Sequence, residues 1–476
     1  MKFFFSTVFI FIAFSSALKA QIVTVSEDIT MLRDVNYDIM GKFGEYILIS
    51  KQYGAEVEME AYDDRLYKSW TKKLNLDVKK ADVISVFPGK NHLYVYYIHE
   101  RKDSSFLMVR KFDAAAELVD STLIKSYIKD GENRNFKLVA SENKEMISLH
   151  CILTEDRLEV LYFDNASMKL LADHLYDVST FDFRKDFNKI LISDRGDLFM
   201  ILDNAKNATR KTDQVLIIIR SGILSEQPFV MEMKELDFFV YSLLFEVDNK
   251  QNAVIAAGLY NDKPGNVSLG FVTFKLPASQ PDQTSVSYIP YEAQTIANAS
   301  DGKKIKVESL TDLEVMDIML RNDGGLVVIA EERKEYERSL YQGRRDFYSM
   351  RFAIDFYYED MVIAGIYPNG TSHWQKILQK KQYSFDDDAM YSSYFTFKNS
   401  SSVRILFNDE IKNENTVSEY ILSGGGKHER KSVLNTNRQD LKLQVRSSLQ
   451  ISANEIIIPS VKRNKLKLVK VAYQRA

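Results

Sequence analysis

The chain repeats a short pattern at intervals of about fifty residues. An aromatic residue followed by aspartate ends a strand-like run at Tyr62-Asp63, at Phe112-Asp113 and at Phe163-Asp164, and a polar turn follows each pair. The runs between these pairs are short and rich in valine, isoleucine, tyrosine and phenylalanine, which is typical of β-strands. A repeat of this length is one supersecondary unit, which has to bury its apolar faces against neighbouring copies.

The number of strands in each repeat indicates the architecture. Hairpin-like stretches precede the second and third pairs, at 87–99 and 141–153, and another strand-like run follows each turn. Four strands in about fifty residues describe one blade of a β-propeller. We therefore predict an all-β fold, a β-propeller with seven or eight four-stranded blades. A β-solenoid would have shorter repeats, and two tandem β-sandwiches would not show this period.

The two ends of the chain are predicted to meet in one blade. The last repeat, 437–476, holds only about three strand-like runs, and residues 21–25 could supply a fourth. Residues 21–476 would then form a single domain whose termini close the ring. Two inserts interrupt the repeat. The first, 277–310, contains prolines and reads as an irregular loop, and the second, 331–351, is charged and aromatic and separates the strands expected at 326–329 and 360–364.

The first twenty residues, MKFFFSTVFIFIAFSSALKA, have the composition of a signal peptide. Lys2 precedes an apolar run that is shorter than the roughly 20 residues of a membrane-spanning helix, and Ala20 offers a cleavage point. A retained anchor is the alternative interpretation. We predict cleavage of 1–20, export to the periplasm or out of the cell, and no membrane span in the remaining chain.

Composition and motifs argue against several function classes. Cys151 is the one cysteine, which rules out an intramolecular disulfide and any multi-cysteine metal site. The net charge is −3 with both signs scattered, so a nucleic-acid partner is not expected. No HExxH, GxSxG, Walker or GxGxxG motif occurs. We therefore expect no resident cofactor, apart from the calcium considered below.

The second insert contains the candidate binding residues. Arginine and tyrosine are enriched at interface hot spots, and tyrosine also stacks on sugars. The alternative interpretation is a solvated excursion held by internal ion pairs, each worth about 0–1 kcal/mol. The candidate binding residues are Tyr336, Arg338, Tyr341, Arg344, Arg345 and Tyr348.

Three consecutive carboxylates, Asp386, Asp387 and Asp388, are the densest acidic stretch. Carboxylate oxygens are the ligands that calcium prefers, so these aspartates are a candidate metal site. The alternating spacing and the glycine of a calcium loop are missing, and a solvated loop at a blade edge is the alternative interpretation.

One part of the chain resembles a known group of proteins. The runs GGLVVIAE at 324–331 and FYYEDMV at 356–362, followed by Asn369-Gly370 and Trp374, resemble uncharacterised exported β-propeller-repeat proteins of Gram-negative bacteria. The resemblance extends over about residues 320–410. It implies a propeller fold and export, but it implies no activity and no functional residues.

These observations support three hypotheses about function. The first is an exported, non-catalytic binding or scaffold protein, expected as a monomer, that recognises a protein or a surface polysaccharide through loops on one propeller face. The second is a glycan-active hydrolase with paired carboxylates in an axial pocket. The third is a purely structural component of the cell envelope.

Overall fold

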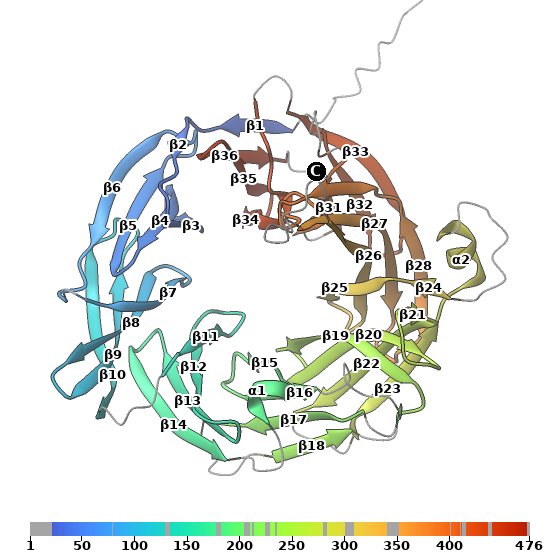
Figure 1. Ribbon diagram of the computed structural model, residues 1–476, viewed down its shortest axis with the longest axis horizontal. Coiled ribbons are helices and arrows are strands. Elements are labelled where there is room, and N and C mark those ends of the chain that lie inside the picture. Colours follow the sequence, from blue (N-terminus) through green and yellow to red (C-terminus); the bar gives the residue numbers. More distant parts are fainter. Residues whose placement is uncertain are drawn as a thin grey trace, which may run out of the picture.

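Each repeat of the sequence folds into a four-stranded antiparallel sheet, and eight such sheets stand side by side in a ring (Figure 1). The computed structural model thus confirms a β-propeller, with eight blades. It describes residues 21–78, 80–128, 134–177, 182–203, 210–211, 214–223, 229–233, 236–278, 283–299, 309–339, 352–399, 401–409, 411, 416–436 and 440–473.

The strands of each blade are given from the ring axis outward. Blade 1 consists of β3 (Asn36–Phe43), β4 (Tyr46–Tyr53), β5 (Glu56–Tyr62) and β6 (Lys68–Leu74), and blade 2 of β7 (Asp82–Pro88), β8 (Leu93–Arg101), β9 (Ser104–Phe112) and β10 (Leu118–Ile128). Blade 3 consists of β11 (Lys137–Ala140), β12 (Met146–Ile152), β13 (Arg157–Asp164) and β14 (Lys169–Asp177), and blade 4 of β15 (Phe187–Ile192), β16 (Leu198–Asp203), β17 (Leu216–Ser221) and β18 (Phe229–Met233). Blade 5 consists of β19 (Phe239–Asp248), β20 (Ala253–Asn261), β22 (Gly270–Pro277) and β23 (Ser285–Pro290), and blade 6 of β25 (Leu313–Leu320), β26 (Leu326–Ser339), β27 (Phe352–Ile366) and β28 (Ser372–Leu378). Blade 7 consists of β30 (Tyr394–Lys398), β31 (Ser402–Asn408), β32 (Thr416–Ser423) and β33 (His428–Asn435), and blade 8 of β34 (Leu449–Ser452), β35 (Glu455–Lys462), β36 (Lys465–Ala472) and β1 (Ile22–Val25).

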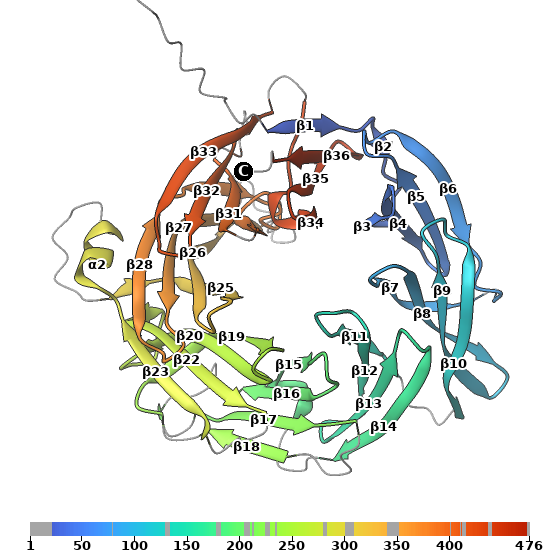
Figure 2. The ribbon, with the colours of Figure 1, turned by 180° about the vertical axis from the view of Figure 1, so that it is seen from behind.

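The ring is closed by the first strand of the chain. Strand β1 pairs antiparallel with β36, from Ile22 opposite Ala472 to Val25 opposite Val469, and so completes blade 8 (Figure 2). The prediction that residues 21–25 supply the fourth strand of the last blade is confirmed. The short elements outside this pattern are β2 (Ile29–Thr30), β21 (Val267–Ser268), β24 (Leu310–Thr311), β29 (Gln382–Phe385), α1 (Phe183–Asp186), α2 (Ala293–Ala299) and the 3-10 turn Val445–Ser447.

Both faces of every blade are buried, which explains why many strands read as continuous apolar runs. Each of the eight blade–blade junctions contains one apolar cluster that draws side chains from both neighbours. Successive side chains of a strand point to opposite faces. On β4, Ile47 and Ile49 therefore pack with blade 8, whereas Leu48 packs with blade 2. Each fully buried side chain of this kind contributes about 1.5–3 kcal/mol.

The two ends of the ring differ in their connections. Each blade is an antiparallel meander. The connection between its first and second strands and the connection between its third and fourth strands therefore lie at the same end of the ring, which we call the turn face. The longest connections there are 222–228 and 278–284. The opposite end, the insert face, carries the remaining loops and the links between blades, and its connections include 291–312, 379–393 and 436–448. The long insertions are therefore on one face.

The first predicted insert is partly wrong. Residues 277–310 were expected to be an irregular loop, but Ser285–Pro290 form β23, the outer strand of blade 5, and Ala293–Ala299 form helix α2. Strand β23 lies at the rim of the ring and is partly exposed, and its two serines and terminal proline interrupt the apolar run that marks the inner strands. Among the residues described, no helix is both long and apolar enough to cross a membrane.

A buried histidine should make the ring sensitive to acid. His150 on β12 is 4% exposed, and burial, assisted by the charge of Lys137, lowers its pKa from the usual 6.5 to about 4. At a pH between these two pKa values, His150 takes up a proton only when the chain is unfolded. The free energy of unfolding therefore falls as the pH decreases from about 6.5 to about 4. At about 1.36 kcal/mol per pKa unit, the loss is about 3 kcal/mol.

The expected result is that His150→Leu is less sensitive to acid than the unsubstituted protein. The free energy of unfolding in urea is measured for both proteins at about pH 7 and at about pH 4. On acidification, the free energy of unfolding of the variant should rise by about 3 kcal/mol relative to that of the parent. Carboxylates that titrate in the same range affect both proteins equally and cancel in this difference. Parallel pH profiles for the two proteins would contradict the assignment.

Candidate functional site on the insert face

Blade 6 carries a sheet that rises above the insert face. Strand β26 continues to Ser339 and β27 begins at Phe352, and the two remain paired throughout, with Ser339 opposite Phe352. Strand β29 adds to the free edge of β27, with Phe385 opposite Asp355. The strands predicted to end near Ile329 and restart near Asp360 are therefore longer, and residues 331–339 of the second insert form one strand of a three-stranded sheet.

Two of the six candidate binding residues lie in this sheet. Tyr336 and Arg338 alternate on β26 and therefore lie on the same side. The guanidinium of Arg338 pairs with the carboxylate of Asp355 on β27, with Nε and Oδ2 3.1 Å apart. The other four candidates, Tyr341, Arg344, Arg345 and Tyr348, lie outside the described residues.

The same side of the sheet carries a group of aromatic rings. Tyr336, Tyr357, Tyr383 and Phe385, here called the aromatic surface, come from all three strands, with ring centroids 5.8, 4.9 and 6.5 Å apart in that order. Tyr336 is 55% exposed and Phe385 is 54% exposed. The hydroxyl of Tyr383 donates a hydrogen bond to Asp355, with the oxygens 2.9 Å apart. Aromatic groups that are exposed together on one surface are typical of binding sites.

Tyr357, Tyr383 and Phe385 were not among the residues predicted from the sequence. The alternation of polar and aromatic residues in Gln382-Tyr383-Ser384-Phe385 was an available signal for a strand with one aromatic side. The pairing of this strand with β27 could not be read from the pattern, because β28 lies between the two segments in the sequence and pairs with the same edge of β27.

The opposite side of the sheet is fixed to the ring. Phe356 and Tyr358 are buried against Ala389, which lies in the loop that leads to blade 7. The guanidinium carbon of Arg333 lies 4.5 Å from the centroid of the Tyr358 ring. The sheet therefore has one anchored side and one side that carries the aromatic surface.

A buried ion pair underlies this anchor. Glu331 on β26 and Lys380 after β28 are fully buried, and their carboxylate and ammonium groups are 2.8 Å apart. The Lys380 ammonium also donates to the backbone carbonyl of Tyr358 and to the side chain of Gln382, at 3.0 and 2.8 Å. The hydroxyl of Ser393, which precedes the first strand of blade 7, donates to Glu331 at 2.7 Å. Burial lowers the pKa of Lys380, an effect that Glu331 opposes.

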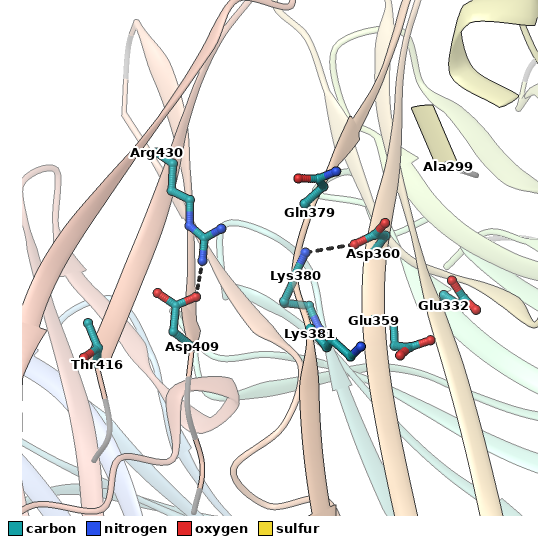
Figure 3. Close-up of a pocket in the computed structure, with 10 residues that line it drawn as sticks. All are labelled: Ala299, Glu332, Glu359, Asp360, Gln379, Lys380, Lys381, Asp409, Thr416 and Arg430. Carbon is teal, nitrogen blue, oxygen red and sulfur yellow. Dashed lines mark hydrogen bonds and ion pairs between the residues drawn. The ribbon is translucent and has the colours of Figure 1, made fainter. Parts of the chain in front are cut away.

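A polar pocket of about 780 Å³ opens beside the base of the sheet (Figure 3). Glu359 continues the alternation of Asp355 and Tyr357 on β27, so it lies on the side of the aromatic surface. Arg430 and Asp409 of blade 7 form an ion pair on the other wall. The lining residues are Ala299, Glu332, Glu359, Asp360, Gln379, Lys380, Lys381, Asp409, Thr416 and Arg430.

Carboxylates are crowded on the blade 6 wall of this pocket. Burial raises the pKa of Glu332, and the charges of Glu359 and Asp360 add to this effect, whereas the ammonium of Lys334 opposes it. Lys334 pairs with Glu332 and also lies 3.5 Å from the carboxylate of Glu359. The pocket thus combines acidic, basic and amide groups, which suits a ligand with many hydrogen-bonding groups.

The three consecutive aspartates begin the loop 386–393 between β29 and β30. Asp386 and Asp388 have positive φ angles of 50° and 52°, and the Asp387 carboxylate accepts a hydrogen bond from the backbone N–H of Ala389 at 3.1 Å. Within the described part of the chain, no three histidine, cysteine, aspartate or glutamate side chains are grouped so that they could hold a metal ion. Calcium binding by these aspartates stays a prediction.

Two carboxylates on inner strands have altered acidity. Burial raises the pKa of Glu246 on β19 and of Asp317 on β25, the inner strands of neighbouring blades. Thr396 on β30 donates to Asp317 at 2.8 Å, and Lys189 on β15 lies 3.8 Å from Glu246. A raised pKa is what a general acid in glycoside hydrolysis requires. The hydrolase hypothesis stays a prediction, and these are its best candidate residues.

Several solved structures are similar to this chain at low sequence identity. No family model matches the chain, and no curated protein matches it. Similar solved structures include Sqt1 of Saccharomyces cerevisiae, 8% identical, with a TM-score of 0.45 over 95% of this chain and 100% of that chain. The WD40 domain of SCAP from fission yeast is 10% identical, with a TM-score of 0.41 over 95% and 98%. The β-propeller domain of Nup133 from Vanderwaltozyma polyspora is 10% identical, with a TM-score of 0.39 over 83% and 100%.

Proposed function

We propose that this protein is an exported, non-catalytic binding protein that recognises a protein or a surface polysaccharide through the sheet on blade 6. The observation that carries the proposal is the aromatic surface, which stands on the face of the ring that bears the long insertions. A rigid scaffold that presents its variable segments on one side is the usual arrangement of a binding protein. The signal-peptide composition of residues 1–20 supports export.

The arrangement of the sheet favours recognition over a purely structural role. Its anchored side is buried against the loop that leads to blade 7, so the exposed aromatic rings on the other side are not needed to hold the sheet in place. Rigid aromatic side chains provide large contact area at low cost in conformational entropy. The polar pocket below them supplies hydrogen-bonding groups next to the rings, which suits a partner with both apolar and polar surface.

The expected result is that Tyr336→Ser combined with Phe385→Ser weakens partner binding by about 100-fold or more. Each exposed ring at a hot spot contributes about 2 kcal/mol, and every 1.4 kcal/mol is tenfold in affinity. The full-length protein, immobilised, would be tested by cross-linking capture of envelope proteins and on an array of surface glycans. Tyr67→Ser is the matched control, because Tyr67 is exposed on the turn face.

A second variant removes the segment between β26 and β27, which contains four of the sequence-predicted residues. Replacing residues 338–353 with Asn-Gly would leave Glu337 and Ile354 paired and joined by a two-residue turn that suits a hairpin. We expect this variant to fold and to lose binding. Retention of all partners by both variants would overturn the proposal.

A further inference from the structure

The turn between β35 and β36 concentrates positive charge on the insert face of blade 8. Lys462 and Lys465 are directly opposite each other across this hairpin, and Lys467 is opposite Ser460 two residues along. Alternation along the strands places these three lysines on one side of the hairpin. Arg463 occupies the turn itself, with a positive φ angle of 50°. Like charges directly opposite each other destabilise a sheet, so this arrangement has a cost.

Two nearby carboxylates compensate only part of this charge. Asp440 pairs with Lys462, while Asp28 pairs with Lys465 at 2.5 Å and with Lys467 at 3.5 Å. Four cations therefore face two aspartates. The excess of positive charge stands out because the chain as a whole is slightly acidic, with a net charge of −3.

These side chains enclose a small hollow. Its volume is about 160 Å³, and it is lined by Asp28, Asp440, Ser460, Lys462, Arg463, Lys465 and Lys467. We call Lys462, Arg463, Lys465 and Lys467 the basic cradle. We propose that the basic cradle binds a phosphate or sulfate group. Several ammonium groups that approach from different directions suit a compact oxyanion with several acceptor oxygens, and lysine binds such groups as a point charge.

A nearby lysine points to the same conclusion. The pKa of Lys442 is lowered, first by burial, while Asp387 opposes the effect and the charge of Lys462 contributes to it. Lys442 lies over the ring of Tyr391, with Nζ 3.7 Å from the ring centroid. The repulsion that Lys442 experiences from Lys462 would be relieved by an anion in the basic cradle.

Calorimetric titration with inorganic phosphate and with sulfate, at constant ionic strength in chloride, tests this proposal on the full chain. We expect saturable binding that Lys462→Gln combined with Lys465→Gln weakens about tenfold or more, because each charge-assisted hydrogen bond contributes substantially. Asp440→Asn should instead tighten binding, because it removes a competing carboxylate. Lys427→Gln, at an exposed turn on the opposite face, is the control and should change nothing.

Vesicles distinguish the sources of the bound group. Binding to vesicles that contain phosphatidic acid, lost in the double variant and absent with pure phosphatidylcholine, would place the group on a lipid headgroup. Binding of the free ions without vesicle binding would place it on a soluble ligand. The proposal is overturned if neither the ions nor the vesicles bind saturably, or if the double variant binds as tightly as the parent.

Discussion

Replacing Lys380 with methionine is expected to lower the free energy of unfolding by about 3–5 kcal/mol, because it leaves the buried carboxylate of Glu331 without its cation. The substitution also removes the donor to the Tyr358 carbonyl and to Gln382 at the base of the blade 6 sheet. Urea unfolding followed by tryptophan fluorescence provides the measurement, since Trp374 belongs to the same junction of blades 6 and 7.

Two further variants separate loss of charge pairing from loss of packing. Lys381→Met changes the exposed neighbouring lysine and should alter stability by less than about 0.5 kcal/mol. Glu331→Gln combined with Lys380→Met removes both charges and keeps an acceptor for the Ser393 hydroxyl, so it should recover much of the loss. Equal effects of Lys380→Met and Lys381→Met would show that the buried pair does not stabilise the junction.

The second large effect is expected at the strand that closes the ring. Val23 and Val25 on β1 pack against the apolar cluster between blades 7 and 8. Replacing both with aspartate places two charges in that cluster, and we expect a loss of about 3 kcal/mol or more. Hydrogen exchange should increase first in β34 to β36 and in β30 to β33, the two blades that share this cluster, and not in blade 4.

The same strand supplies its own control. Ile22 alternates with Val23 and is 58% exposed, so Ile22→Asp adds a charge without burying it. This variant should alter stability by less than about 0.5 kcal/mol. If Ile22→Asp and the double variant were equally destabilising, or if hydrogen exchange increased uniformly around the ring, β1 would not stabilise the ring locally.

The blades could be predicted because their signal is local. A strand with both faces buried reads as an apolar run, and the turns between strands carry their own polar residues, so the spacing of about fifty residues follows from the sequence. The same reasoning failed for the blade 6 sheet. Residues 333–338 stand above the ring, and their charged and aromatic side chains do not alternate as they do in a half-buried strand.

The candidate site was harder to predict than the fold for a physical reason. Tyr336 and Arg338 could be identified because arginine and tyrosine cluster in one segment. Tyr383 and Phe385 join them only because β29 pairs with β27, and Asp409 and Arg430 contribute to the polar pocket only because blade 7 follows blade 6 around the ring. Such neighbourhoods depend on tertiary packing, which a single sequence does not record.

The pairing of β1 with β36 also determines when the ring can close during synthesis. Strand β1 leaves the ribosome long before β36, the strand with which it pairs. Until then β1 has no partner, and an unpaired strand edge promotes aggregation. Contacts between such distant segments also form slowly. A chain caught midway through synthesis would therefore lack this pairing, and the ring can become stable only after β36 has been made.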